Sequence, residues 1–138
     1  MKKSLLFIGT IIFLMTAILS GCNEKEAIKI QNNFEGITFE SSVFELVDAS
    51  LEFYEKQNVI TRVDVKYLFR NIAGRAVYDV RVTVEFYDKN NNLLTIGGPK
   101  YISLAKGYTE QGIGLANIIS YSGEKVSEVD HVKIIAEE

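Results

Sequence analysis

The sequence predicts an all-β fold, an antiparallel β-sandwich of about seven strands, and two patterns support this. First, apolar and polar residues alternate along two segments rich in β-branched and aromatic residues, as in half-buried strands. Second, turn-forming residues recur about every 8–12 positions, which is typical of sandwiches. A length of 138 residues, of which 47% are hydrophobic, suits one folded domain and excludes a disordered chain.

The two clearest strands are expected near residues 62–70 and 78–87. Their inward positions are Val63, Val65, Tyr67 and Phe69 in the first, and Tyr78, Val80, Val82, Val84 and Phe86 in the second. Asn71–Gly74 is expected to form a turn between them, and Asp88–Asn92 a polar turn after them. Their pairing stays open. A direct hairpin would place Asp64 opposite Arg81 and Lys66 opposite Asp79, whereas in some sandwiches such strands lie in different sheets.

Weaker patterns complete the sandwich. Shorter strands are expected at residues 50–56, 93–96, 101–104, 108–115 and 131–136, with Gly97-Gly98-Pro99 and Ala105-Lys106-Gly107 between them. Residues 37–47 form another extended candidate, although 42–47 also fit a short helix. Residues 117–129 have no clear pattern, and we expect the pair Ile118-Ile119 to bury against the sandwich.

The amino terminus has the organisation of a secretory signal peptide. Lys2 and Lys3 precede an apolar run over residues 5–19, and the chain turns polar after Leu19-Ser20-Gly21-Cys22. A basic start, an apolar stretch of about 7–15 residues and small residues at the end define such a peptide. The run is shorter than the roughly 20 residues that span a bilayer as a helix.

Leu19-Ser20-Gly21-Cys22 resembles the lipobox of bacterial lipoproteins. The resemblance implies cleavage between Gly21 and Cys22 and a diacylglyceryl group on the Cys22 thiol. This group would hold the protein on the outer face of the cytoplasmic membrane, and a Gram-positive envelope is favoured. The expected organisation is a signal peptide over 1–21, a lipidated Cys22 with a polar tether over 22–33, and one domain over 34–138. The alternatives to the lipobox are an ordinary secretory signal or a membrane anchor in which Cys22 is incidental. The alternatives to the tether are an edge strand or a helical turn beginning near Ala27.

A second resemblance covers residues 62–111. An FxLYD-type domain is resembled by Tyr67-Leu68-Phe69-Arg70-Asn71, by the segment from Val80 to Asp88 with Leu93-Leu94 after a polar turn, and by Ile102–Gly107. Domains of this family are small immunoglobulin-like β-sandwiches of bacterial envelope proteins. The resemblance implies an immunoglobulin-like, extracytoplasmic domain and transfers no catalytic residue.

Composition and motifs argue against most chemistry. One Cys excludes an internal disulfide and multi-Cys metal sites, and a net charge of −3 argues against a nucleic-acid partner. Asp88–Asn92 begins like a calcium loop but lacks the glycine and glutamate that an EF-hand requires. No Ser of the chain lies in a nucleophile motif that could act with His131, and on a strand Asp130 would point to the face opposite His131. We therefore expect no catalytic residue, no metal and no cofactor.

Four residues are candidates for surface contact. Arg62, Lys66 and Arg70 share the polar face of one strand, where a basic patch is the less favoured interpretation and a solvated face balanced by Asp64, Asp79 and Glu85 is the favoured one. Tyr87 points outward from the next strand. The expected function is a membrane-anchored, non-catalytic binding or structural module, with an envelope protein or cell-wall component as partner. The alternatives are a small-ligand-binding accessory protein, a prophage or mobile-element surface lipoprotein, and a hydrolase.

Overall fold

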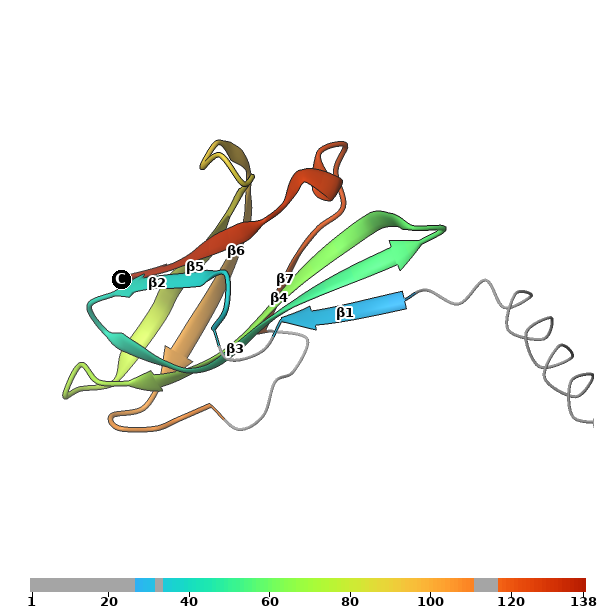
Figure 1. Cartoon of the computed structure of the whole chain (residues 1–138). Coiled ribbons are helices and arrows are strands. Elements are labelled where there is room, and N and C mark those ends of the chain that lie inside the picture. The colour runs from blue at the N-terminus through green and yellow to red at the C-terminus, as the bar shows by residue number, and fades with distance from the viewer. Residues whose placement is uncertain (1–26, 32–33, 111–116) are drawn as a thin grey trace, which may run out of the picture.

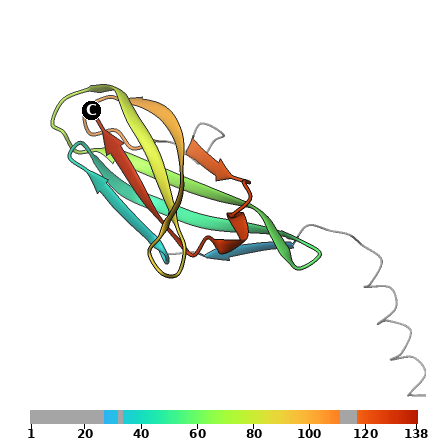
Figure 2. The same ribbon diagram turned by 90° about the horizontal axis from the view of Figure 1, so that it is seen from above.

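The computed structural model describes residues 27–31, 34–110 and 117–138, which form eight strands and no α-helix. The strands make two four-stranded sheets in a sandwich-like arrangement (Figures 1 and 2), so the all-β prediction is confirmed. Sheet A has the order β1 (Ala27–Gln31), β3 (Phe44–Lys56), β4 (Val59–Asn71), β7 (Ile118–Tyr121). Sheet B has the order β2 (Ile37–Ser41), β8 (His131–Glu137), β5 (Val77–Tyr87), β6 (Leu93–Leu104).

Two long hairpins make up the body of the sandwich. β3 pairs with β4 through a two-residue loop, in which Gln57 and Asn58 have φ values of 52° and 62°. Positive φ at both central residues is the geometry of a type I′ turn, which matches the twist of the strands. β5 pairs with β6 in the other sheet. The two clearest predicted strands, β4 and β5, therefore lie in different sheets, and the direct hairpin between them does not form.

One strand pair departs from the antiparallel prediction. β2 lies parallel to β8, with Ile37 opposite Val132 and Ser41 opposite Ala136. This pairing places β8 between β2 and β5, in the interior of sheet B.

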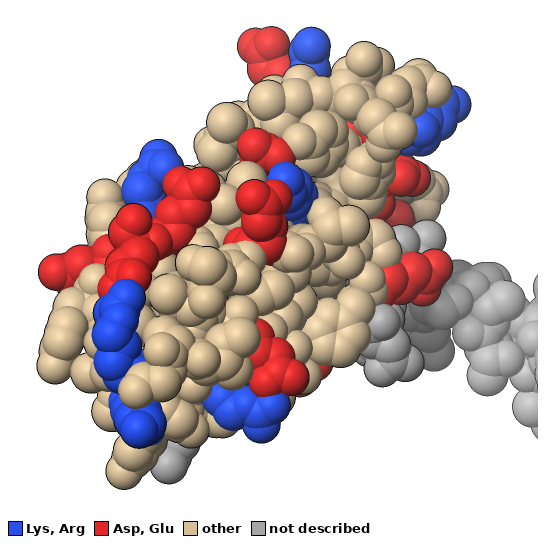
Figure 3. All heavy atoms as spheres, turned by 90° about the vertical axis from the view of Figure 1, so that its left-hand side faces the viewer, with Lys and Arg blue, Asp and Glu red and all other residues tan. Residues whose placement is uncertain are grey.

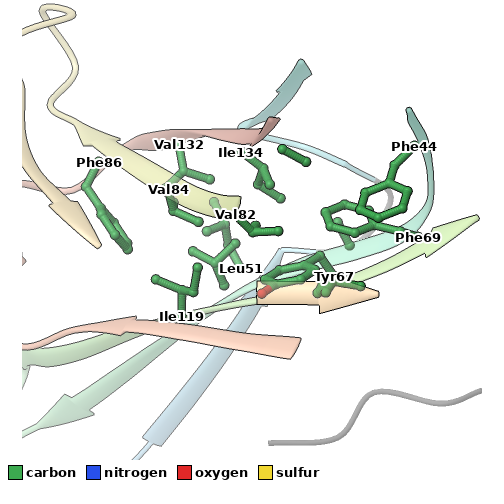
Figure 4. Packing of buried hydrophobic residues seen from close by; sticks show 14 of the residues in the cluster. Phe44, Leu51, Tyr67, Phe69, Val82, Val84, Phe86, Ile119, Val132 and Ile134 are labelled. Carbon is green, nitrogen blue, oxygen red and sulfur yellow. The ribbon is translucent and has the colours of Figure 1, made fainter. Parts of the chain in front are cut away.

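The core lies between the sheets and contains all but one of the predicted inward residues of β4 and β5, several of which are labelled in Figure 4. The four inward residues of β4 are fully buried, as are four of the five predicted for β5. Phe69 stacks between Phe44 and Tyr67, with ring centroids 5.1 and 4.9 Å away. Burying a large apolar side chain contributes about 1.5–3 kcal/mol, so this alternation accounts for much of the driving force.

Tyr78 is the exception, and the prediction that it faces the core is wrong. It is 72% exposed, whereas Val77 and Val80 are fully buried. The register with β6 shifts between Val77 and Val80, and Asp79 has a φ of 52°. This β-bulge inserts one extra residue into β5 and turns Tyr78 outward.

β6 runs through the segment predicted to separate two strands. The register with β5 shifts between Val82 and Val84, opposite Gly98 and Pro99, and the strand continues on both sides. Gly97 allows a close approach at this point, because a Cβ there would lie 2.7 Å from the Ile119 side chain in the other sheet.

Three other boundaries differ from the predictions. Residues 44–47 belong to β3, so the helical alternative for 42–47 is wrong. Of the strand predicted over 108–115, Thr109 pairs with Arg70 as an isolated bridge, and residues 111–116 lie outside the described residues. Ile118 and Ile119 begin β7; Ile119 is buried as expected, whereas Ile118 is only half-buried.

The tether predicted over 22–33 is wrong for residues 27–31. These residues form β1, which pairs antiparallel with β3 and matches the edge-strand alternative. Gly21 and Cys22 lie outside the described residues, as does the whole of the signal peptide predicted over residues 1–21. In the part of the chain that is described, no helix has the length and apolar character to cross a membrane.

Candidate functional site

Arg62, Lys66 and Arg70 lie on β4, but each is paired with an acidic residue. Arg62 Nε lies 3.1 Å from Asp64 Oδ1, and Lys66 Nζ lies 2.8 Å from Glu52 Oε1. Arg70 Nε donates a 2.9 Å hydrogen bond to Glu45 Oε2. The positive charges are thus balanced on sheet A, and the three side chains form no unopposed basic patch.

Arg62 and Lys66 belong to a polar network that is largely hidden from water. Its other members, Glu52, Tyr54 and Asp64, are only 8%, 9% and 6% exposed. The Arg62 guanidinium lies 3.8 Å from the Tyr54 ring centroid, and the Tyr54 hydroxyl donates a 2.8 Å hydrogen bond to Glu52. Such contacts satisfy charges that would otherwise be costly to bury.

The network shifts the pKa of its members in the directions its contacts predict. Burial alone would raise the pKa of Glu52, but hydrogen bonds from Lys66 and Tyr54 outweigh burial and lower it. The pKa of Lys66 is raised, mainly by its bond to Glu52. The Glu52–Lys66 pair therefore stays ionised and internally neutral at pH 7, which is the behaviour of a structural element.

Tyr87 lies on the other sheet, so the four predicted contact residues do not form one site. It has the outward position predicted for it and is partly exposed. Its ring stacks on His131, with centroids 5.3 Å apart and planes 6° apart. Its hydroxyl donates to Glu85, and this bond is the main reason that the pKa of Tyr87 is raised.

Beside Tyr87 runs a line of exposed hydrophobic residues, Leu93, Ile96 and Tyr101, which we call the β6 row. They stand opposite Tyr87, Glu85 and Arg81 on β5, and they are 50%, 54% and 62% exposed. Exposed hydrophobic residues that share one face of an edge strand are a candidate interaction surface. Tyr78, turned outward by the bulge, extends the apolar character of this sheet.

The third strand of this face carries charge. Lys133 of β8 stands opposite Glu85, and its Nζ lies 2.5 Å from Glu40 Oε2. Its bond to Glu40 raises the pKa of Lys133. The face thus combines a hydrophobic margin on β6 with paired charges on β8 and β2.

His131 contacts Asp130, which the alternation of a strand does not predict. The His131 Nδ1 and Asp130 Oδ2 atoms lie 2.9 Å apart. Asp130 precedes the first residue of β8, so the alternation of faces does not apply to it. The expectation that Asp130 points away from His131 is therefore wrong.

An open groove of about 490 Å³ borders this face at one end. Its lining residues are Asp88, Lys89, Asn90, Ser127, Glu128, Val129 and Asp130. The Asp88 carboxylate accepts bonds from the backbone N–H groups of Asn90 and Asn92, at 2.8 and 2.9 Å, and from the Asn92 amide. These bonds, the Asn92 amide first, lower the pKa of Asp88. Asp88–Asn92 is thus the polar turn that the sequence predicts.

Among the residues that the structure describes, no three His, Cys, Asp or Glu side chains are grouped so as to hold a metal ion.

Figure 3 shows one face of the molecule, on which basic and acidic side chains lie close to one another. Comparisons with protein-family models, curated proteins and solved structures found no match to this chain.

The sequence patterns did not reveal the β6 row. Ile96 and Tyr101 are five positions apart, an odd spacing that places residues on opposite faces of a regular strand. The irregularity at Gly97–Lys100 shifts the register and brings both to the same face. Gly97-Gly98-Pro99 is the feature of the sequence that could have indicated this irregularity, because Gly and Pro occur at bulges within strands as well as at strand ends.

Proposed function

We propose that this protein is a lipoprotein, held through Cys22 on the outer face of the cytoplasmic membrane, and that it acts there as a non-catalytic binding module. The observation that carries the proposal is Leu19-Ser20-Gly21-Cys22 between an apolar run and a polar segment. Two acyl chains on Cys22 would anchor the protein stably without a membrane-spanning helix. Anchoring confines the domain to a surface and raises its effective concentration toward neighbouring components.

The finer fold proposal is an immunoglobulin-like domain of the FxLYD type. Two of the segments that carry this resemblance, Tyr67–Asn71 and Val80–Asp88, belong to β4 and to β5 with its following residue. Their inward residues meet in one core, as in a sandwich whose consecutive strands cross between sheets.

The proposed partner surface is the β6 row together with Tyr87, and its proposed occupant is an envelope protein. Aromatic residues are enriched at protein interfaces, and rims of mixed charge are typical of them. Here Tyr101 and Tyr87 supply the aromatic surface, and the Lys133–Glu40 pair supplies part of the charge.

Lipidation is tested by comparing the wild-type chain with Cys22→Ser in a bacterial host fed a labelled fatty acid. The wild type should incorporate the label, fractionate with membranes and have a mature terminus at Cys22 by mass spectrometry. The variant should lose the label. Equal labelling and membrane association of both proteins would refute the anchor.

The partner surface is tested by photocrosslinking in the native cell, with a photoreactive amino acid at Ile96 or Tyr101. The control position is Val47, which is 39% exposed on β3 of the other sheet. The β6 row should crosslink to a discrete protein that position 47 does not capture. Crosslinks to cell-wall polymer, or the same products from all three positions, would refute a protein partner on this face.

A further inference from the structure

The register of β1 fixes which end of the sandwich lies nearest to Cys22. Ala27, the first residue of β1, stands opposite Glu55, near the end of β3. Ala27 is five residues after Cys22 in the sequence. Because an extended chain covers at most about 3.6 Å per residue, roughly 18 Å is the greatest separation of their Cα atoms. An anchor at Cys22 therefore holds this end of sheet A close to the bilayer.

The turn of the β3–β4 hairpin, residues 56–59, lies at this same end. Figure 1 shows the hairpin and the start of β1 extending in the same direction, and Figure 2 agrees. The turn contains one cation and no acid: Lys56, Gln57, Asn58 and Val59. Val59 is 57% exposed although it begins a strand that is otherwise rich in buried residues.

We propose that the hairpin turn 56–59 rests against the headgroups of the bilayer when Cys22 carries its lipid. This inference depends on the proposed anchor and adds an orientation to it. Val59 supplies an apolar side chain at headgroup depth, and Lys56 supplies a charge that anionic headgroups attract. The type I′ turn holds both side chains at the tip of a paired hairpin, so they reach the surface without ordering a loop.

The opposite end of the sandwich supplies a matched reference. Ile72 lies just beyond the other end of β4 and is 56% exposed, nearly the same fraction as Val59. The Ile72 N–H donates a 2.9 Å hydrogen bond to the Val43 carbonyl, so its backbone is held in place. β4 spans 13 residues, and at about 3.3 Å per residue it separates the two positions by roughly 40 Å.

The test uses the full lipidated chain reconstituted into vesicles of phosphatidylcholine and phosphatidylglycerol. Acylation occupies the Cys22 thiol, and the chain has no other Cys, so Val59→Cys or Ile72→Cys provides a single site for an environment-sensitive fluorophore. A headgroup-bound quencher should reduce the emission of the label at position 59 and leave position 72 unchanged. Circular dichroism and thermal melting should show that both labelled variants fold like the wild type.

Two different results would overturn the inference, and they are distinguishable. If the protein floats with the vesicles but both labels respond equally, or neither responds, the hairpin is not the membrane-facing end. If neither variant floats and Cys22 carries no lipid mass, the proposed anchor fails and the orientation fails with it. Quenching confined to position 72 would place the opposite end at the membrane.

Discussion

The carboxylate of Glu110 accepts a hydrogen bond from the backbone N–H of Phe69, at 3.0 Å. The Glu110 N–H donates in turn to the Phe69 carbonyl, also at 3.0 Å. Glu110 therefore satisfies both backbone groups of a fully buried residue near the end of β4. The same carboxylate oxygen accepts a 3.0 Å bond from the Asn117 amide, which joins the start of β7 to this point.

Replacing Glu110 separates the role of its acceptor from the role of its charge. Glu110→Ala leaves the Phe69 N–H without its partner and should lower the free energy of unfolding by about 1–3 kcal/mol. Glu110→Gln keeps an acceptor oxygen, so its loss should be under about 1 kcal/mol. Urea denaturation of both variants at pH 7 checks the order, and an equal loss would show that the charge matters rather than the acceptor.

The Glu110 charge should also make stability depend on pH. Burial raises the pKa of Glu110 above its ordinary value of 4.5, although the bond from Phe69 opposes this. The folded state then holds the proton more tightly than the unfolded state. The contribution of this group is fully present below pH 4.5 and is lost as the pH rises through the raised pKa. The wild type should therefore lose stability relative to Glu110→Gln as the pH rises over that window. A stability difference between the two proteins that does not change with pH would contradict the assignment.

The Lys66–Glu52 pair should contribute more to stability than the Arg70–Glu45 pair on the same strand. The Glu52 side chain is 11% exposed, whereas both partners of the other pair are nearly half exposed, at 46% and 48%. Lys66→Met should cost about 1–3 kcal/mol, because it leaves a buried carboxylate without its cation. Arg70→Met should cost under about 1 kcal/mol. Similar losses in urea denaturation would refute the difference.

The same substitution should change the titration of Glu52. Its pKa is lowered in the folded protein, so its contribution to stability is present above pH 4.5 and is lost as the pH falls through the lowered pKa. Lys66→Met removes the main opposing hydrogen bond and should raise this pKa. An NMR titration of the Glu52 side chain measures the shift. Arg70→Met is the control and should leave the pKa of Glu52 unchanged.

Asn71 should be the most sensitive polar residue at the end of the sandwich farther from β1. Its amide nitrogen lies 2.8, 3.0 and 3.2 Å from the carbonyls of Arg75, Leu104 and Ala105, and its oxygen accepts from the Ala73 N–H at 2.8 Å. Asn71→Ala should lower the free energy of unfolding by about 2–3 kcal/mol, because these buried groups lose their partner. The exposed Asn90→Ala is the control. A loss below that of the control in urea denaturation would contradict this role.

Tyr67 and Tyr54 should respond oppositely to removal of the hydroxyl. Figure 4 shows the Tyr67 oxygen among core side chains, and among the described residues it has no hydrogen-bond partner. Its burial, and secondarily the Glu110 charge, raises the pKa of Tyr67. Tyr67→Phe should match or exceed wild-type stability, since no bond is lost and a buried polar atom is removed. Tyr54→Phe should lose about 1–2 kcal/mol with its bond to Glu52. The melting temperatures of both variants test this contrast.

The alternation of apolar and polar residues predicted which strand side chains are buried, because the face to which a side chain points depends only on its position along its own strand. The alternation correctly placed Val63, Val65, Tyr67 and Phe69 in the core and Tyr87 outside it. It failed at Tyr78, where the bulge at Asp79 interrupts the parity. Pairing was not predictable in this way, since β4 and β5 have the same pattern whether or not they share a sheet.

The candidate site depended on long-range geometry. Arg62, Lys66 and Arg70 form a patch in the sequence, but the acids that neutralise two of them come from β3. Nothing in the local sequence identifies these partners, because they follow from the register of the β3–β4 hairpin. The β6 row likewise required the irregularity opposite Val82–Val84.

The position of β8 has a consequence for the order of synthesis. β8 is an interior strand of sheet B, yet it follows every other described strand in the sequence. Until residues 131–137 have been made, β2 has no neighbour in its sheet and β5 lacks one of its two. A nascent chain therefore cannot complete the sandwich early. Under the proposed lipoprotein assignment, the signal peptide over residues 1–21 would reach the export machinery while sheet B is still unassembled.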